Sequence, residues 1–286
     1  MTSRDYNIAV LLPTHRRTDA LHRSLFSLID LAHDLESVQF RLGIDNNDEI
    51  GLNYFIDNIQ PELDARNINY EALEFEPLGY AGLNQYFNTL AQDASADWLF
   101  VWCDDAIMQT QDWDQRIREC TGEFRLLKVH THNEHPYSIF PIVPRTWFEH
   151  LGQLSRHQMI DAEISQMAYM VDMIEIVDID VTHNQVELVQ APTESVKAKH
   201  RFEANPQDIQ DFHYPATIEQ RHEDCDRLCA YMKNQGQDTS FWQSVKDKTR
   251  DPWERLKAND INQHMFQFDI AYDGNNITSI TQPGES

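Results

Sequence analysis

Apolar residues along the first hundred positions alternate between short continuous runs and helical stripes. Residues 8–12 form a continuous apolar run, which is typical of a strand buried on both faces, and Pro13 ends that strand. Thr18 or Asp19 is expected to cap the helix that follows. The apolar face of that helix repeats at helical spacing: Leu21, Leu25, Leu28 and Ile29.

The alternation continues through residue 102. The pattern predicts strands at 38–44, 73–75 and 98–102 and a helix from about Gly82. Strands that alternate with helices predict an α/β fold with a mainly parallel sheet flanked by helices. In such a sheet, ligands bind beyond the carboxyl ends of the strands. The side chains at those ends are expected to share one crevice: Pro13 and Thr14, Asp45, and the run Cys103, Asp104 and Asp105.

The pattern changes in the second half of the chain. Residues 126–143 are strand-like but irregular, a helix is expected at 161–170, and a late strand ends at His183. Beyond a soft boundary near residue 191, two amphipathic helices are expected at 216–233 and 240–258, followed by a β-hairpin within 265–280. The predicted organisation is a domain of residues 1–190 and a mostly helical C-terminal extension of residues 191–286.

Composition narrows the classes of function. The chain of 286 residues carries 23 basic and 47 acidic side chains, a formal net charge of −24. So acidic a surface repels DNA and anionic lipid at long range. The chain shows neither a signal peptide nor a membrane span, and its four cysteines are too few and too scattered for a disulfide framework. We therefore expect a cytoplasmic protein with no membrane span and no unmodified nucleic-acid partner.

Five segments together resemble one enzyme family in order and approximate spacing. The longest combines LGYAGLN at 78–84 with ADWLFVWCDD at 96–105. The others are AVLLPTHRR at 9–17, IDNND at 44–48, MIDAEI at 159–164 and VTH at 181–183. They resemble the inverting glycosyltransferases of family two, most closely the rhamnosyltransferase-like branch. The resemblance covers residues 7–185 and implies the GT-A fold, a nucleotide-diphosphate sugar donor and a divalent metal, Mn²⁺ or Mg²⁺.

The resemblance also implies roles for single residues. Asp105 and His183 would hold the metal, with Asp104 nearby, because hard cations take oxygen ligands and imidazole suits Mn²⁺. Asp161 would be the general base that takes the proton of the acceptor hydroxyl. Asp45 would accept hydrogen bonds from the nucleobase. The remaining residues expected around the donor are Pro13, Thr14, Arg17, Gly79, Gly82 and Asn84, of which Asn84 alternatively caps a helix.

One position departs from the family. Its metal motif normally reads Asp-x-Asp or Asn-x-Asp, and here Cys103 stands first. This departure supports an alternative, a catalytically inactive relative that binds a sugar or a protein. A further alternative is nucleotidyl transfer, which the glycine-free loop of residues 13–17 disfavours because such enzymes hold a triphosphate in a glycine-rich loop. The donor is expected to be a UDP- or dTDP-sugar, and the acceptor stays open among saccharide, lipid-linked glycan, protein and modified nucleic acid.

Each candidate residue also has a purely structural interpretation. Asp161 fits a helix N-cap, Asp45 fits a turn cap, and His183 fits an ordinary hydrogen-bonded histidine. Gly79 and Gly82 fit close packing of a helix on a strand. The functional interpretation requires one site that brings Asp105 together with Asp45 and Asp161.

Overall fold

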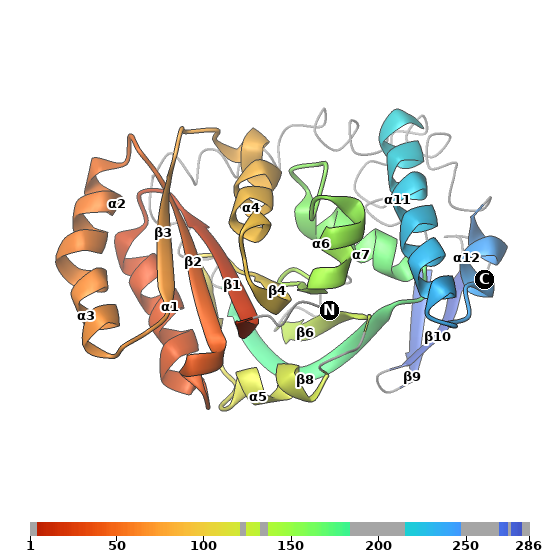
Figure 1. Cartoon of the computed structure of the whole chain (residues 1–286), viewed down its shortest axis with the longest axis horizontal. Helices are drawn as coiled ribbons and strands as arrows, with labels where there is room; N and C mark the ends of the chain where they lie inside the picture. The colour runs from red at the N-terminus through yellow and green to blue at the C-terminus, as the bar shows by residue number, and fades with distance from the viewer. Residues whose placement is uncertain are drawn as a thin grey trace.

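The computed structural model has a central β-sheet with helices on both faces (Figure 1). It describes residues 5–120, 124–131, 137–183, 215–246, 269–273 and 276–281. Within these segments, no helix has both the length and the apolar character that a bilayer crossing requires.

The first half of the sheet is parallel. The strand order of the eight-stranded sheet is β3-β2-β1-β4-β7-β6-β8-β5. The first four of these pair in parallel and confirm the predicted strands: β1 (Tyr6–Thr14), β2 (Val38–Asp45), β3 (Tyr70–Phe75) and β4 (Ala96–Val101). The apolar run of residues 8–12 is fully buried in β1, which lies between β2 and β4. The carboxyl ends of β2, β1 and β4 are therefore neighbours.

The second half of the sheet is mixed, but four of the seven strand pairings in the sheet are parallel, which agrees with the predicted fold class. Its strands are β5 (Ala106–Met108), β6 (Leu126–Thr131), β7 (Ile142–Pro144) and β8 (Ile174–His183). β7 is antiparallel to β4 and β6, and β8 is parallel to β6 but antiparallel to β5. The irregular segment predicted at 126–143 therefore contains β6 and most of β7, which pair antiparallel.

A short link between β4 and β5 forces the sheet to curl. β4 is fourth and β5 eighth in the sheet, so a flat sheet would separate them by about 19 Å. The link closes in a tight turn, in which Ala106 N donates to Cys103 O at 3.2 Å. Two extended residues and such a turn span at most about 14 Å. The second half must therefore bend back toward β4, and Figure 1 shows β8 as a strongly bent strand.

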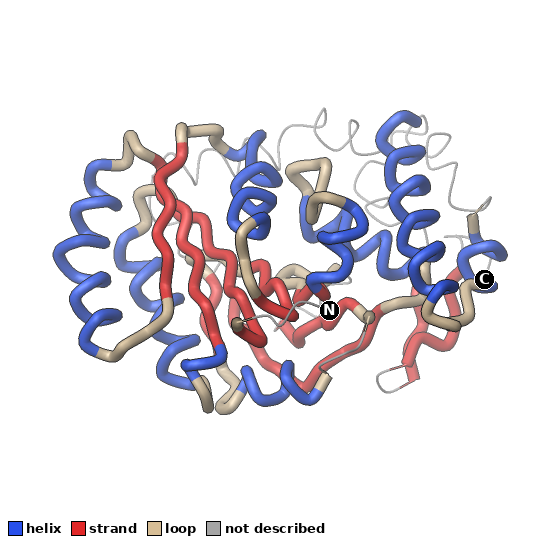
Figure 2. The backbone as a smooth tube through the Cα atoms, viewed as in Figure 1, coloured by secondary structure: helices blue, strands red, loops and turns tan. Residues whose placement is uncertain are grey.

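Helices lie on both sides of the sheet (Figure 2). Alternate residues of the buried strands face two hydrophobic clusters, one on each side of the sheet. In β1, Ile8, Val10 and Leu12 belong to one cluster, and Ala9 and Leu11 belong to the other. The first cluster includes side chains of α1 (Thr18–Leu31), η2 (Phe55–Ile59), α3 (Gln60–Ala65) and α5 (Trp113–Glu119). The second includes side chains of α4 (Leu83–Gln92), α6 (Arg145–Leu151) and α7 (Ile160–Met170).

The C-terminal elements agree with prediction where they are described. α11 (Pro215–Asn234) and α12 (Ser240–Val245) confirm two helices, and the expected continuation over 247–258 lies outside the described residues. β9 (Asp269–Asp273) and β10 (Asn276–Thr281) pair antiparallel and confirm the hairpin. Buried side chains of α11 and α12 join the same hydrophobic cluster as β1 and β4. The division near residue 190 stays a prediction.

Two helix starts differ from the capping interpretations. α1 begins at Thr18 with Arg17 in the cap position and no side-chain cap hydrogen bond, so neither Thr18 nor Asp19 caps it. α7 begins at Ile160 with Met159 in the cap position, so Asp161 lies inside the first turn and is not the N-cap.

Candidate active site

Three loops meet beyond the carboxyl ends of β2, β1 and β4, and the loop after β1 contacts the other two. Thr14 Oγ1 donates to Asp104 Oδ2 at 2.7 Å, and Arg17 Nη1 donates to Asp104 Oδ1. On its other side, His15 Nδ1 lies 2.9 Å from Asp45 Oδ2. The structure therefore brings Asp45 and Asp104 into one connected site, as the shared-crevice prediction requires.

Asp48, in the loop after β2, also holds the loop after β1. Arg16 N donates to Asp48 Oδ2 at 2.5 Å. The other oxygen of Asp48, Oδ1, accepts from Gly51 N at 2.9 Å, so the Asp48 side chain caps α2 (Glu49–Tyr54). A Cβ atom at Gly51 would lie 2.2 Å from Asp48 Oδ2, so this cap requires glycine. Arg16 itself adopts φ of 54°, in the left-handed region. No role was predicted for Asp48, although an Asp directly before a helix is a capping signal.

Asp104 and Asp105 occupy the two central positions of the turn between β4 and β5. Both are buried, with 6% and 8% of their surface exposed. The antiparallel pairing of β5 with β8 sets Ala106 opposite His183. His183 Nε2 accordingly lies 3.3 Å from Asp105 Oδ1, and Cys103 Sγ donates to the same oxygen at 2.6 Å.

These side chains form a cluster suited to a divalent metal. One ligand atom from each of Cys103, Asp105 and His183 lies within 4.8 Å of the other two. Thiolate, carboxylate and imidazole are all established ligands of divalent transition metals. The two predicted ligands therefore come together, with Cys103 as an additional donor. Asp104 points elsewhere, because its oxygens accept from Thr14 and Arg17.

The surroundings of the turn shift the pKa values of Asp104 and Asp105 in opposite directions. Burial alone would raise the pKa of Asp105, but the hydrogen bond and charge of His183 and the charge of Arg17 bring it below its ordinary range. Burial raises the pKa of Asp104, against the charge of Arg17. Burial, together with the charge of Asp105, also raises the pKa of the Cys103 thiol. Asp105 is therefore the carboxylate that stays ionised toward a cation, and Asp104 orients Arg17.

Asp161 lies near His183 from the side of α7. Burial raises the pKa of Asp161, and the charge of His183 acts in the opposite direction. Tyr137 is also close, since its pKa is raised by burial and then by the charge of Asp161. The carboxylate predicted as general base therefore shares its electrostatic surroundings with the predicted metal ligand His183.

Asp45 is held from two sides and is 4% exposed. Tyr86 Oη donates to Asp45 Oδ1 at 2.5 Å, opposite the contact with His15. Leu78 N donates to Tyr86 Oη at 2.8 Å, which links Asp45 to the segment before Gly79. Burial and the bond to Asp45 raise the pKa of Tyr86 to about 12. Nothing in the sequence around Tyr86 or His15 indicated that these two side chains would contact Asp45.

The glycines before α4 shape a tight turn. Gly79 has φ of +63° and ψ of −167°, and a Cβ atom there would meet nothing within 4 Å, so its requirement is conformational. A Cβ atom at Gly82 would lie 2.4 Å from Leu78 Cβ, so that glycine permits close packing. Asn84 does not cap α4, because it lies inside the helix, and its Nδ2 donates to Ser155 O at 3.5 Å.

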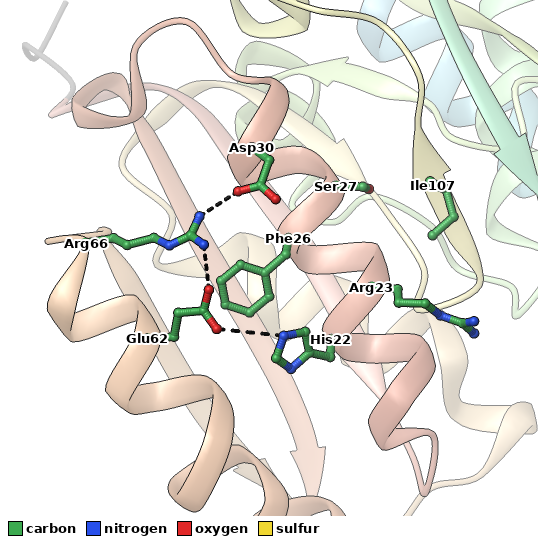
Figure 3. A pocket seen from close by; sticks show the side chains of 8 residues that line it. All are labelled: His22, Arg23, Phe26, Ser27, Asp30, Glu62, Arg66 and Ile107. Atoms are coloured by element: carbon green, nitrogen blue, oxygen red, sulfur yellow. Dashed lines mark hydrogen bonds and ion pairs between the residues drawn. The ribbon is translucent and has the colours of Figure 1, made fainter.

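A separate cleft of about 560 Å³ opens between α1 and α3 and contains none of the predicted site residues (Figure 3). Arg66 Nη1 and Nη2 each lie 2.5 Å from a carboxylate, of Asp30 and Glu62 respectively. The guanidinium carbon of Arg66 lies 5.1 Å from the centre of the Phe26 ring. The charges of Arg66, Asp30 and Glu62 in this cleft are therefore paired with one another.

The curled eight-stranded sheet, with helices on both faces and an acidic turn after β4, is an α/β fold of the GT-A type. No protein-family model matches the chain, and no curated protein matches its sequence.

Solved structures share this fold at low sequence identity. S. aureus TarS 1–349 is 13% identical, with a TM-score of 0.51, and the match covers 96% of this chain and 99% of that chain. TarS 1–349 in complex with UDP-GlcNAc gives a TM-score of 0.50 at 13% identity, covering 95% and 98%. Mannosyltransferase PcManGT from Pyrobaculum calidifontis, in complex with GDP-Man and Mn²⁺, gives 0.50 at 8% identity, covering 91% and 81%. At such identities the likeness establishes the fold, which confirms the GT-A expectation.

Proposed function

We propose that this chain is an inverting glycosyltransferase of the family-two kind, which moves a sugar from a UDP- or dTDP-sugar to an acceptor hydroxyl. The observation that carries the proposal is the cluster of Asp105 and His183, connected to Asp45 through the loop after β1 and flanked by Asp161. The fold supports it, since PcManGT holds GDP-Man with Mn²⁺ and TarS holds UDP-GlcNAc on the same architecture.

The leaving diphosphate gains negative charge as its bond to the anomeric carbon lengthens. A divalent metal held by Asp105 and His183, Mn²⁺ or Mg²⁺, would supply positive charge at that point. Arg17 would add a second positive group, because Asp104 orients its guanidinium and its Nη1 lies 3.7 Å from Asp105 Oδ2. On a chain with a net charge of −24, these local cations are what make the approach of an anionic donor favourable.

Asp161 would act on the acceptor. As the acceptor oxygen forms its bond to the anomeric carbon, the bond from that carbon to the diphosphate oxygen breaks, and the hydroxyl proton passes to Asp161. Burial raises the pKa of Asp161, which makes its carboxylate a stronger base than an exposed one. A positioned base of this kind contributes ~10²–10⁴-fold in rate. Inversion requires that Asp161 act on the face of the sugar opposite the diphosphate.

The nucleoside would lie over the carboxyl ends of β1 and β2. Asp45, whose oxygens already accept from Tyr86 and face His15, would accept a further hydrogen bond from the base. The residues that would line the rest of the donor pocket are Pro13, Thr14, Gly79, Gly82 and Asn84.

The test is release of nucleoside diphosphate from UDP-, dTDP- and GDP-sugars, with Mn²⁺, with Mg²⁺ and with chelator. We expect Asp105→Asn and Asp161→Asn to lose at least roughly a hundredfold in rate. Asp57→Asn, an exposed carboxylate of η2, is the matched control and is expected to keep full activity. The anomeric configuration of the product, read by NMR, tests inversion.

Other outcomes would favour the alternatives. Release of pyrophosphate from a nucleoside triphosphate would indicate nucleotidyl transfer. Saturable binding of a nucleotide sugar without turnover would indicate an inactive relative. Full activity of both site variants, with folding intact, would reject the site assignment.

A further inference from the structure

We infer that Cys103 is itself a metal ligand, and that the cluster of Cys103, Asp105 and His183 selects Co²⁺ or Zn²⁺ over Mn²⁺ and, most strongly, over Mg²⁺. The inference concerns the same cation position as the proposed function, and it rests on that function for its biological purpose only.

The geometry of the cluster suits a small transition-metal ion. In a tetrahedral site with metal–sulfur distances of about 2.3 Å and metal–nitrogen or metal–oxygen distances of about 2.1 Å, neighbouring ligand atoms lie about 3.4–3.6 Å apart. His183 Nε2 and Asp105 Oδ1 are already 3.3 Å apart. Cys103 Sγ lies 2.6 Å from that oxygen and needs to move by about 1 Å to reach the same spacing.

The three ligands project from well-supported backbone. Ser24 Oγ donates to Cys103 O at 2.8 Å and accepts from Trp102 Nε1 at 2.8 Å, which fixes the start of the turn. His183 ends β8, and its ring meets the ring of Phe140 edge-on at 5.2 Å between centroids. A strand end and a hydrogen-bonded turn hold the backbone of the three ligands in place without the metal, so only the Cys103 side chain has to adjust, which favours ions whose preferred geometry matches this arrangement.

The donor types decide which ion gains most. Mg²⁺ prefers six oxygen ligands, and a thiolate offers it little. Thiolate and imidazole favour Co²⁺ and Zn²⁺, and affinity at such sites rises from Mn²⁺ through Co²⁺. As Cys103 Sγ coordinates, its proton passes to solvent. Three protein ligands also leave a coordination position open, as in catalytic metal sites. An aspartate in place of Cys103 would offer oxygen instead and shift the preference toward Mn²⁺ and Mg²⁺.

The experiment uses the full chain, stripped of metal by chelation and titrated with Co²⁺. We expect a thiolate-to-cobalt charge-transfer band in the near ultraviolet that saturates at one equivalent. Cys103→Ser is expected to lose the band and to bind Zn²⁺ at least tenfold more weakly, with Mn²⁺ affinity changed less than threefold. Cys103→Asp is expected to lose the band and to gain affinity for Mn²⁺. Cys120→Ser is the matched control, because Cys120 Sγ lies at the end of α5 and bonds Arg116 O.

The band is independent of transferase activity, so the two proposals fail separately. A band of equal strength in Cys103→Ser, or an unchanged Zn²⁺ affinity in that variant, would overturn the inference. If the native chain shows no band yet cleaves a nucleotide sugar with Mn²⁺, the inference is wrong and the proposed function stands. If the band appears but no nucleotide sugar is bound or cleaved, the inference stands and the proposed function is wrong. Thermal unfolding of each variant confirms that the fold is retained.

Discussion

Glu163 offers a sharp test of what holds α7 in place. Its side chain is 1% exposed, and its Oε2 accepts from Ser155 Oγ, from Arg156 N at 2.8 Å and from His157 N at 3.0 Å. Burial raises the pKa of Glu163, and the charge of the buried Arg221 in α11 opposes that rise. One carboxylate thus joins the start of α7, the loop before it and the C-terminal helix.

Two substitutions separate the hydrogen bonds from the charge. Glu163→Ala removes three hydrogen bonds, each worth about 1 kcal/mol, together with a counter-charge of Arg221. Loss of one member of a buried ion pair costs about 3–5 kcal/mol in total. Glu163→Gln keeps an oxygen for the three donors and removes only the charge, so we expect it to cost less than Glu163→Ala by the roughly 3 kcal/mol of the three hydrogen bonds.

Urea unfolding at neutral pH measures both costs, and thermal unfolding supports them. For a chain of this size, the alanine variant should melt roughly 6–20 °C lower. Glu74→Ala, an exposed glutamate of β3, is the control and should change stability by under about 0.5 kcal/mol. A cost below about 1 kcal/mol for Glu163→Ala would refute the reasoning. Equal costs for the glutamine and alanine variants would show that the charge, not the hydrogen bonds, holds the loop.

Three further outcomes follow from single residues. A general base works only when ionised, and burial raises the pKa of Asp161. We therefore expect kcat/KM to fall as the pH drops through a value above the ordinary aspartate pKa of about 3.9. This acidic limb should be absent from the residual activity of Asp161→Asn. Gly79→Ala places a side chain at φ of +63° and should cost about 1–3 kcal/mol in thermal unfolding; an unchanged melting temperature would contradict the conformational requirement. Gly51→Ala drives Cβ into Asp48 and should cost about 0.5–2 kcal/mol through loss of the α2 cap, with a rise in the donor KM if the cap fixes the loop after β1.

The sequence predicts those parts of the fold whose signals are local. The apolar run of residues 8–12 is buried on both faces in β1, and His183 ends β8 as expected. Strand β5 was not predicted, because three residues carry no periodic pattern and their pairing with β8 is decided by tertiary contact. The same long-range pairing determines the curl of the sheet.

Some residues of the candidate site could likewise be predicted from the sequence, and others could not. Residues at strand ends, such as Asp45 and Asp105, could be proposed from the sequence because the chain direction of a parallel sheet sets where strand ends lie. Their partners His15 and Tyr86 could not, since each contact joins segments whose separation in the sequence gives no hint of contact. In the sequence Cys103 is only a departure from the metal motif, and its proximity to Asp105 and His183 in the structure is what makes it a candidate donor.

The turn of Cys103–Asp105 is also the joint between the two halves of the sheet. The Asp105 carboxylate contacts His183 only while β5 keeps its register on β8. A shift in the register of β5 on β8 would move Asp105 away from His183 and so separate the ligands, even though each of those residues is unchanged. An ion held by Asp105 and His183 would therefore also stabilise the pairing of β5 with β8, so metal binding and closure of the sheet would be thermodynamically coupled.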